Sequence, residues 1–164
     1  MFRHVLVPLD LRFIPKVTLM TAAVLAKEQG AELTLLYVSD IASDLPAAGV
    51  TAISDDVLQR YQCDIRRSFA NALAIIAEYG STASASMVNG IPVHKMINRA
   101  AVTLQADVIV MGTHGRRGLA HAFWGSVTED VLREADIPVL AIHESPTATF
   151  APISWERLCA DETS

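Results

Sequence analysis

The chain has 164 residues, of which 51% are apolar and 19% charged, and its formal net charge is −5. This length fits one domain with its own hydrophobic core. The acidic balance and the lack of a basic run argue against nucleic-acid binding, and no apolar stretch reaches the roughly 18 residues of a membrane span. With no signal-peptide pattern and two cysteines that match no metal spacing, we expect a cytoplasmic protein.

The chain begins with a strand, a helix and a second strand. The apolar run 4–9 predicts a strand buried on both faces, because no polar side chains alternate with the apolar ones. Residues 15–29 follow with helical spacing, and Gly30 stands where a left-handed C-cap glycine belongs. Residues 32–38 predict the second strand.

The middle of the chain repeats this alternation. Residues 39–54 are rich in small and polar side chains and predict a long loop. A helix follows at 55–78, with its apolar residues along one stripe. Residues 82–88 predict a third strand, mainly because the alternation demands one. Residues 93–104 then form the clearest amphipathic helix of the sequence.

The last part of the chain contains the two remaining strands. Residues 107–112 predict a strand buried on both faces. A loop at 113–125 leads into a short helix at 126–134, and residues 137–142 predict the final strand. We therefore expect one domain at 1–143 and a polar C-terminal tail at 144–164.

Strands that alternate with helices predict an α/β fold. We expect a single-domain, doubly wound sandwich with a parallel five-stranded sheet in the order 3-2-1-4-5 and helices on both faces. The winding then changes direction between strands 1 and 4, where ligands bind outside the carboxyl ends of the strands. Asp10 ends the first strand and Gly112 the fourth, so the loops that follow them should face each other there.

The loop after the fourth strand contains the most informative residues. Gly112 and Gly115 are followed by nine residues and then by Gly125 and Ser126. Glycines let backbone N–H groups surround an anion, and Ser126 opens a helix whose unpaired N–H groups favour negative charge. Such a loop can wrap a polyphosphate, and Arg116 could add positive charge.

Structural roles for the same residues remain an alternative. The glycines could end a strand and permit turns, and Ser126 with Glu129 matches a capping box. Glu129 and Asp130 would also oppose a phosphate at this helix end. The sequence has no Walker A lysine and no Gly-x-Gly-x-x-Gly after the first strand, which removes the P-loop NTPase and classical dehydrogenase interpretations.

These motifs resemble those of the universal stress protein family. The Gly-x2-Gly-x9-Gly-Ser pattern is similar to the family's ATP-binding signature, and the segments 4–10 and 30–38 resemble its first two strands. The resemblance implies a stress-response regulator that binds an adenine nucleotide (ATP, ADP or AMP, with or without Mg2+). It also implies a homodimer, formed through the last strand from Ile137 to Ile142. We expect slow hydrolysis or none, because the sequence identifies no acid to hold a metal ion and no positioned nucleophile.

The resemblance further implies which residues bind the nucleotide. Adenine and ribose would lie near the first two strands, the α-phosphate near the end of the fourth, and the remaining phosphates in the glycine loop. With Arg116 added for its charge, the predicted set is Pro8, Asp10, Val38, Met111, Gly112, Gly115, Arg116, Gly125, Ser126 and Val127. We predict no catalytic residue and no metal ligand.

One segment departs from the family's pattern. Members commonly have Asp-Gly-Ser after the first strand, whereas this chain has Asp10 followed by Leu11, Arg12 and Phe13. Leu11 or Phe13 could crowd the mouth of the site, and Arg12 could instead pair with a phosphate. The alternative function is therefore a nucleotide-independent stress adaptor or dimerisation module, in which the glycine loop is structural.

Overall fold

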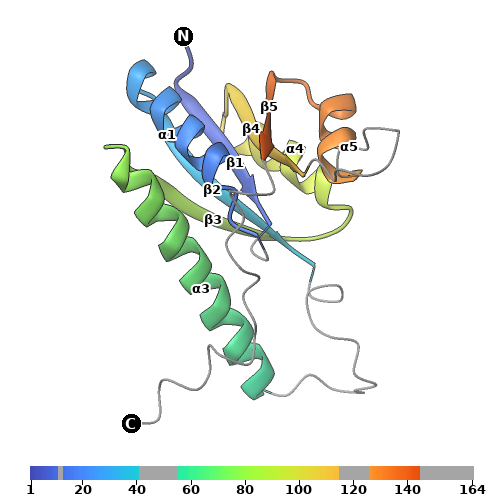
Figure 1. Ribbon diagram of the computed structural model, residues 1–164. Helices are drawn as coiled ribbons and strands as arrows, with labels where there is room; N and C mark the ends of the chain where they lie inside the picture. Colours follow the sequence, from blue (N-terminus) through green and yellow to red (C-terminus); the bar gives the residue numbers. More distant parts are fainter. Residues whose placement is uncertain (11–12, 41–54, 115–125, 145–164) are drawn as a thin grey trace.

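A computed structural model describes residues 1–10, 13–40, 55–114 and 126–144, without the side chains of His114 and Ser126. Strands and helices alternate along it (Figure 1). The strands are β1 (His4–Leu9), β2 (Glu32–Ser39), β3 (Ser84–Asn89), β4 (Val108–His114) and β5 (Val139–Glu144). The helices are α1 (Lys16–Gln29), α3 (Asp55–Glu78), α4 (Val93–Thr103) and α5 (Ser126–Glu134).

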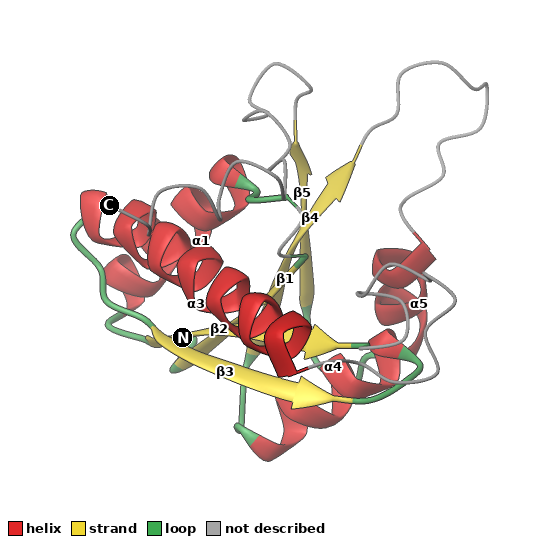
Figure 2. Ribbon diagram, turned by 90° about the horizontal axis from the view of Figure 1, so that it is seen from below, coloured by secondary structure: helices red, strands yellow, loops and turns green. Residues whose placement is uncertain are grey.

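The strands form one parallel sheet in the order β3-β2-β1-β4-β5, which confirms the predicted topology. Helices cover both of its faces (Figure 2). Because side chains alternate along a strand, β1 contributes to two cores. Val5 and Val7 pack in the cluster beneath α1 and α3, and Leu6 packs in the cluster beneath α4 and α5. This double burial is why β1 is apolar without interruption.

Several predicted boundaries agree with the structure. The helices expected at 55–78 and 126–134 have those bounds. Gly30 ends α1 with φ 62°, and its N–H bonds to the Lys27 carbonyl, as a left-handed cap requires.

The predicted bounds of the third, fourth and last strands were wrong. The third strand begins at Ser84 rather than 82, and the fourth continues through Gly112 to His114. The last strand lies at Val139–Glu144 rather than at 137–142. The cause is pairing: β4 and β5 remain in register up to His114 and Glu144, and this hydrogen bonding extends both strands. Ile137 precedes β5 and packs against the α4–α5 core, which accounts for its apolar character.

None of the helices in the described part of the chain is long and apolar enough to cross a membrane. The predicted loop at 41–54, most of the glycine loop at 115–125 and most of the predicted tail at 145–164 lie outside the described residues.

Candidate functional site

The carboxyl ends of β1 and β4 separate from each other. The two strands pair only at Val5–Val108 and Leu6–Ile109. Beyond these pairs, β1 continues beside β2 as far as Leu9, and β4 continues beside β5 as far as His114. The separation falls where the winding changes direction, between the first and fourth strands. A parallel α/β sheet binds its ligands at such a point.

Four of the predicted site residues share one face of the sheet near this opening. Val38 and Met111 are 7% and 5% exposed and belong to the core beneath α4 and α5. Pro8 is two residues after Leu6 of the same core, so it faces the same side. Val127, in the first turn of α5, packs against this core too. The structure thus brings together an apolar wall from four different elements.

Asp10 lies at the end of β1 and is exposed. Its carbonyl accepts a hydrogen bond from the Phe13 N–H at 2.9 Å, which closes a tight turn. Leu11 and Arg12, inside that turn, are outside the described residues, so their predicted effects on the site stay predictions.

Gly112 has a packing role that the sequence did not indicate. A Cβ atom there would lie 2.9 Å from Thr18 Oγ1 and 3.2 Å from Pro15 Cβ. Both neighbours belong to the start of α1, on the sheet face opposite the apolar wall. The missing side chain therefore lets β4 and α1 approach each other closely, which supports the structural alternative at this one glycine.

Glu144 is a functional candidate that the sequence analysis placed in the polar tail. It is the last residue of β5 and only 3% exposed. Its carboxylate accepts hydrogen bonds from the Thr18 N–H at 2.7 Å and the Thr18 hydroxyl at 2.6 Å. A further bond comes from the Val17 N–H at 3.4 Å. These groups open α1, whose N-cap residue Pro15 offers no side-chain acceptor. A protein carboxylate thus occupies the positive end of α1.

The first turn of α5 is held beside the end of β4. Thr128 is buried, and its hydroxyl donates to the Gly112 carbonyl at 3.5 Å. Glu129 accepts a hydrogen bond from Arg133 at 2.9 Å. The Ser126 side chain lies outside the described residues, so the capping box stays a prediction. Within the described residues, no carboxylate bonds to the first N–H groups of α5 as Glu144 does at α1, and a helix N-terminus without such a partner suits an anion.

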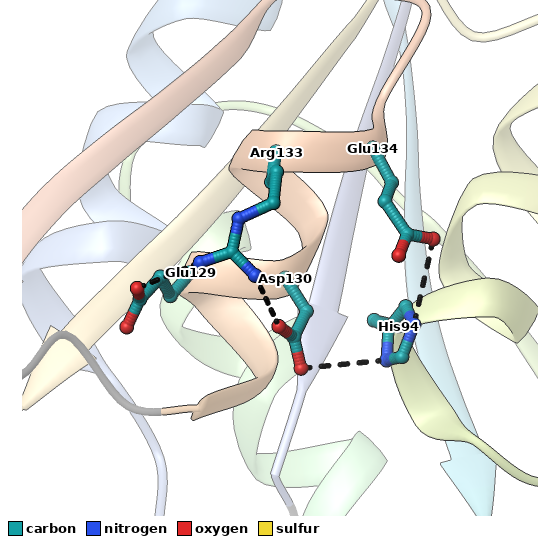
Figure 3. A network of polar contacts seen from close by, with 5 residues as sticks. All are labelled: His94, Glu129, Asp130, Arg133 and Glu134. Carbon is teal, nitrogen blue, oxygen red and sulfur yellow. Dashed lines mark hydrogen bonds and ion pairs between the residues drawn. The ribbon is translucent and has the colours of Figure 1, made fainter.

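The acidic side chains of α5 have basic partners (Figure 3). Arg133 lies 2.9 Å from Glu129 and 3.4 Å from Asp130. His94 of α4 faces two carboxylates, with Nδ1 3.6 Å from Asp130 and Nε2 3.5 Å from Glu134. Arg133 offsets part of the negative charge that would otherwise oppose a phosphate at this helix end.

The structure does not describe most of the remaining predicted residues. Gly115, Arg116 and Gly125 are outside the described residues, and for Ser126 only the backbone at the start of α5 is described. In the described segments, no three His, Cys, Asp or Glu side chains gather where they could hold a metal ion.

Comparison with known proteins identifies the family. The model of the universal stress protein family matches residues 1–143. The chain belongs to the universal stress protein family. Universal stress protein MJ0531 of Methanocaldococcus jannaschii is 28% identical over 144 residues, which cover 87% of this chain and 82% of the relative. Universal stress protein YxiE of Bacillus subtilis is 29% identical over 148 residues, with 87% and 99% covered.

Solved structures of universal stress proteins have the same fold. MJ0577 of M. jannaschii gives a TM-score of 0.70 at 25% identity and covers 88% of this chain and 98% of its own. A universal stress protein in complex with cAMP gives 0.59 at 23% identity, with 88% and 98% covered. A universal stress protein of Archaeoglobus fulgidus in complex with dAMP gives 0.62 at 22% identity, with 85% and 97% covered.

Proposed function

We propose that this universal stress protein binds an adenine nucleotide, with ATP as the leading candidate, and acts as a homodimeric regulator in the stress response. The observation that carries the proposal is the separation of β1 from β4, with the start of α5 beside it. Apolar side chains near this opening would contact a base, and the N-terminus of α5 would favour a phosphate. The cAMP and dAMP complexes of relatives support this choice, because both ligands contain adenine and one phosphate.

The residue roles follow from this arrangement. Pro8 and Val38 would contact the base, Asp10 would accept a hydrogen bond from the base or ribose, and Met111 and Gly112 would line the path to the phosphates. The phosphates would lie against the glycine loop and the start of α5, at Gly115, Arg116, Gly125, Ser126 and Val127. These assignments extend the family resemblance to positions near the opening.

Turnover in this site would be slow or absent. Efficient phosphoryl transfer requires an acid that holds a metal ion and a positioned nucleophile. Two carboxylates near the opening could be considered for such a role, but Glu129 is paired with Arg133, and Asp10 is an exposed residue directly after β1. Regulation through bound nucleotide therefore suits the chain better than catalysis. The compartment we expect is the cytoplasm, which contains a pool of nucleotides.

A nucleotide-independent adaptor is the second candidate. The close approach of Gly112 to Thr18 favours it, because one glycine of the motif has a structural reason of its own. The adaptor and the sensor would share the fold and differ in whether the glycine loop binds a ligand.

Calorimetric titration separates the two functions. The protein, stripped of carried-over nucleotide, is titrated with ATP, AMP and cAMP, with and without Mg2+. We expect micromolar binding that is lost in Gly115→Val and retained in Gly118→Val, a matched change in the same loop but outside the predicted set. A folded wild-type protein that binds none of these nucleotides would contradict the proposal and favour the adaptor.

A further inference from the structure

A groove runs between the edge strand β3 and helix α4. Its volume is about 300 Å3, within the range of pockets that accept ligands. Its lining comes from β3, α4 and the residue that follows α4: Ser86, Val88, Asn89, Met96, Arg99, Ala100, Thr103 and Leu104. In Figure 2, β3 lies at the margin of the sheet with α4 along one side.

The outer edge of β3 carries no further strand within the described residues. The strand ends the sheet order and, in the described part of the chain, pairs only with β2. Ser84, Ala85 and Asn89 are exposed, and Met87 is 49% exposed. Edge strands present unpaired backbone N–H and C=O groups that can receive another strand. Small side chains on β3 leave those groups accessible.

The groove has an apolar floor and a positive rim. Val88, Met96 and Leu104 pack against the core from this side. Arg99 is exposed, and no carboxylate of the described residues lies within 4 Å of its guanidinium. Neither β3 nor α4 contains an aspartate or glutamate, and α4 also contributes Lys95. This face is thus positive in a chain whose net charge is −5.

We propose that the groove binds an extended, acidic peptide segment of a partner protein by strand addition to β3. Peptide-recognition domains bind extended peptides in this way at an open sheet edge, with main-chain hydrogen bonds for affinity and pockets for alternate side chains. One apolar side chain of the peptide would occupy the floor formed by Val88, Met96 and Leu104. A neighbouring carboxylate would pair with Arg99. The proposal does not depend on nucleotide binding, because none of the residues that line the groove belongs to the predicted nucleotide set.

Charge favours this occupant over a second copy of the chain. Symmetric pairing of two β3 edges would bring two positive rims together, since neither β3 nor α4 offers an acidic residue to the other copy. An acidic segment complements the rim instead. The open edge beside the groove also suits a continuous chain better than an isolated small acid.

The first experiment selects peptides on the intact protein. A random 12-residue phage library is panned on the immobilised full chain, and the affinity of the selected peptides is measured by fluorescence anisotropy. We expect sequences that combine an acidic with an apolar residue. Arg99→Glu should weaken their binding about tenfold or more by charge reversal. Arg66→Glu, an equal charge change on α3, should leave it unchanged.

Two further measurements test the binding mode. Ser86→Phe would fill the groove at an edge position that tolerates aromatic residues, and it should abolish peptide binding while circular dichroism and nucleotide binding stay as in the wild type. Methylation of alternate peptide amides should abolish binding in one register and spare it in the other, as strand addition requires. The proposal is wrong if panning enriches no peptide, if selected peptides are insensitive to Arg99→Glu, or if hexanoate binds the groove and peptides do not.

Discussion

At Gly112 the fourth strand passes so close to α1 that a single methyl group would not fit. Thr18 Oγ1 is the nearest obstacle at 2.9 Å, and it is held there by its hydrogen bond to Glu144. The same glycine belongs to the nucleotide motif, so its absence of a side chain can serve packing, ligand approach or both. Measurements on the nucleotide-free protein separate these roles.

Gly112→Ala should therefore destabilise the protein in the absence of any nucleotide. We expect a loss of about 1–3 kcal/mol in the free energy of unfolding, as for other overpacked sites. Thr18→Ala should also be destabilising, because Glu144 loses a hydrogen-bond donor. In the double variant the clash is relieved. Its loss in the free energy of unfolding should therefore be about 1 kcal/mol smaller than the sum of the two single-variant losses. Urea denaturation measures all four proteins. If Gly112→Ala is as stable as the wild type, the glycine is not required for packing.

At the scale of the elements, Asp107 joins the start of β1 to the start of β4. Its Oδ2 accepts the Arg3 N–H at 2.6 Å and the His4 N–H at 2.8 Å. These two backbone hydrogen bonds, that of Arg3 first, lower the pKa of the Asp107 carboxyl below its usual value. The ionised carboxylate thus holds the central strands together at one end, while their other ends separate around the candidate site.

Asp107→Asn should show this link in the pH dependence of stability. Because the folded protein lowers the pKa, the carboxylate stabilises the fold above its unfolded pKa of about 3.9, and that contribution is lost as the pH falls through the folded pKa. The wild type should be more stable than Asp107→Asn between pH 5 and 7, judged by chemical denaturation. The difference should shrink below about pH 4. A difference that stays constant with pH would contradict the role of the charge.

At the scale of the whole molecule, the sheet has two edges with different chemistry. The β3 edge is rich in small residues and lies beside the positive groove. The β5 edge is apolar, and its Leu140 is 39% exposed. Exposed apolar edge strands are prone to pair with another chain. If the proposed homodimer forms, we expect it to form through β5, which leaves β3 for other partners.

Leu140→Glu should convert the dimer into a monomer. A buried glutamate without a partner at a dimer interface carries a large desolvation cost. Val24→Glu on α1 is the matched control, since Val24 is an exposed apolar residue (44%) that does not belong to the edge strand. Sedimentation velocity should show a monomer for the first variant and a dimer for the wild type and the control. A wild-type monomer, or a dimer that survives Leu140→Glu, would exclude assembly through this edge.

Much of the architecture could be predicted from local patterns. Buried strands and amphipathic helices differ in the spacing of apolar residues, and this spacing placed α3 and α5 at their observed bounds. Gly30 indicated the end of a helix, because a left-handed C-cap needs a positive φ and glycine adopts it without steric cost. The alternation of elements predicted the order of the strands and so the point where the winding changes direction. The glycine motif follows the strand that ends at this point, which indicated where a ligand should lie.

Contacts between distant residues decided the rest. The sequence alone determined the five alternating strands, the two-sided sheet and the glycine motif, because each depends on residues close together in the chain. Only the tertiary structure decided that Glu144 caps α1, that Gly112 is needed for packing, and that β1 and β4 separate after two pairs. The physical reason is that capping, close approach and strand pairing depend on groups that are distant in the sequence and meet only in the folded chain. The spacing of apolar residues along the sequence does not predict these contacts.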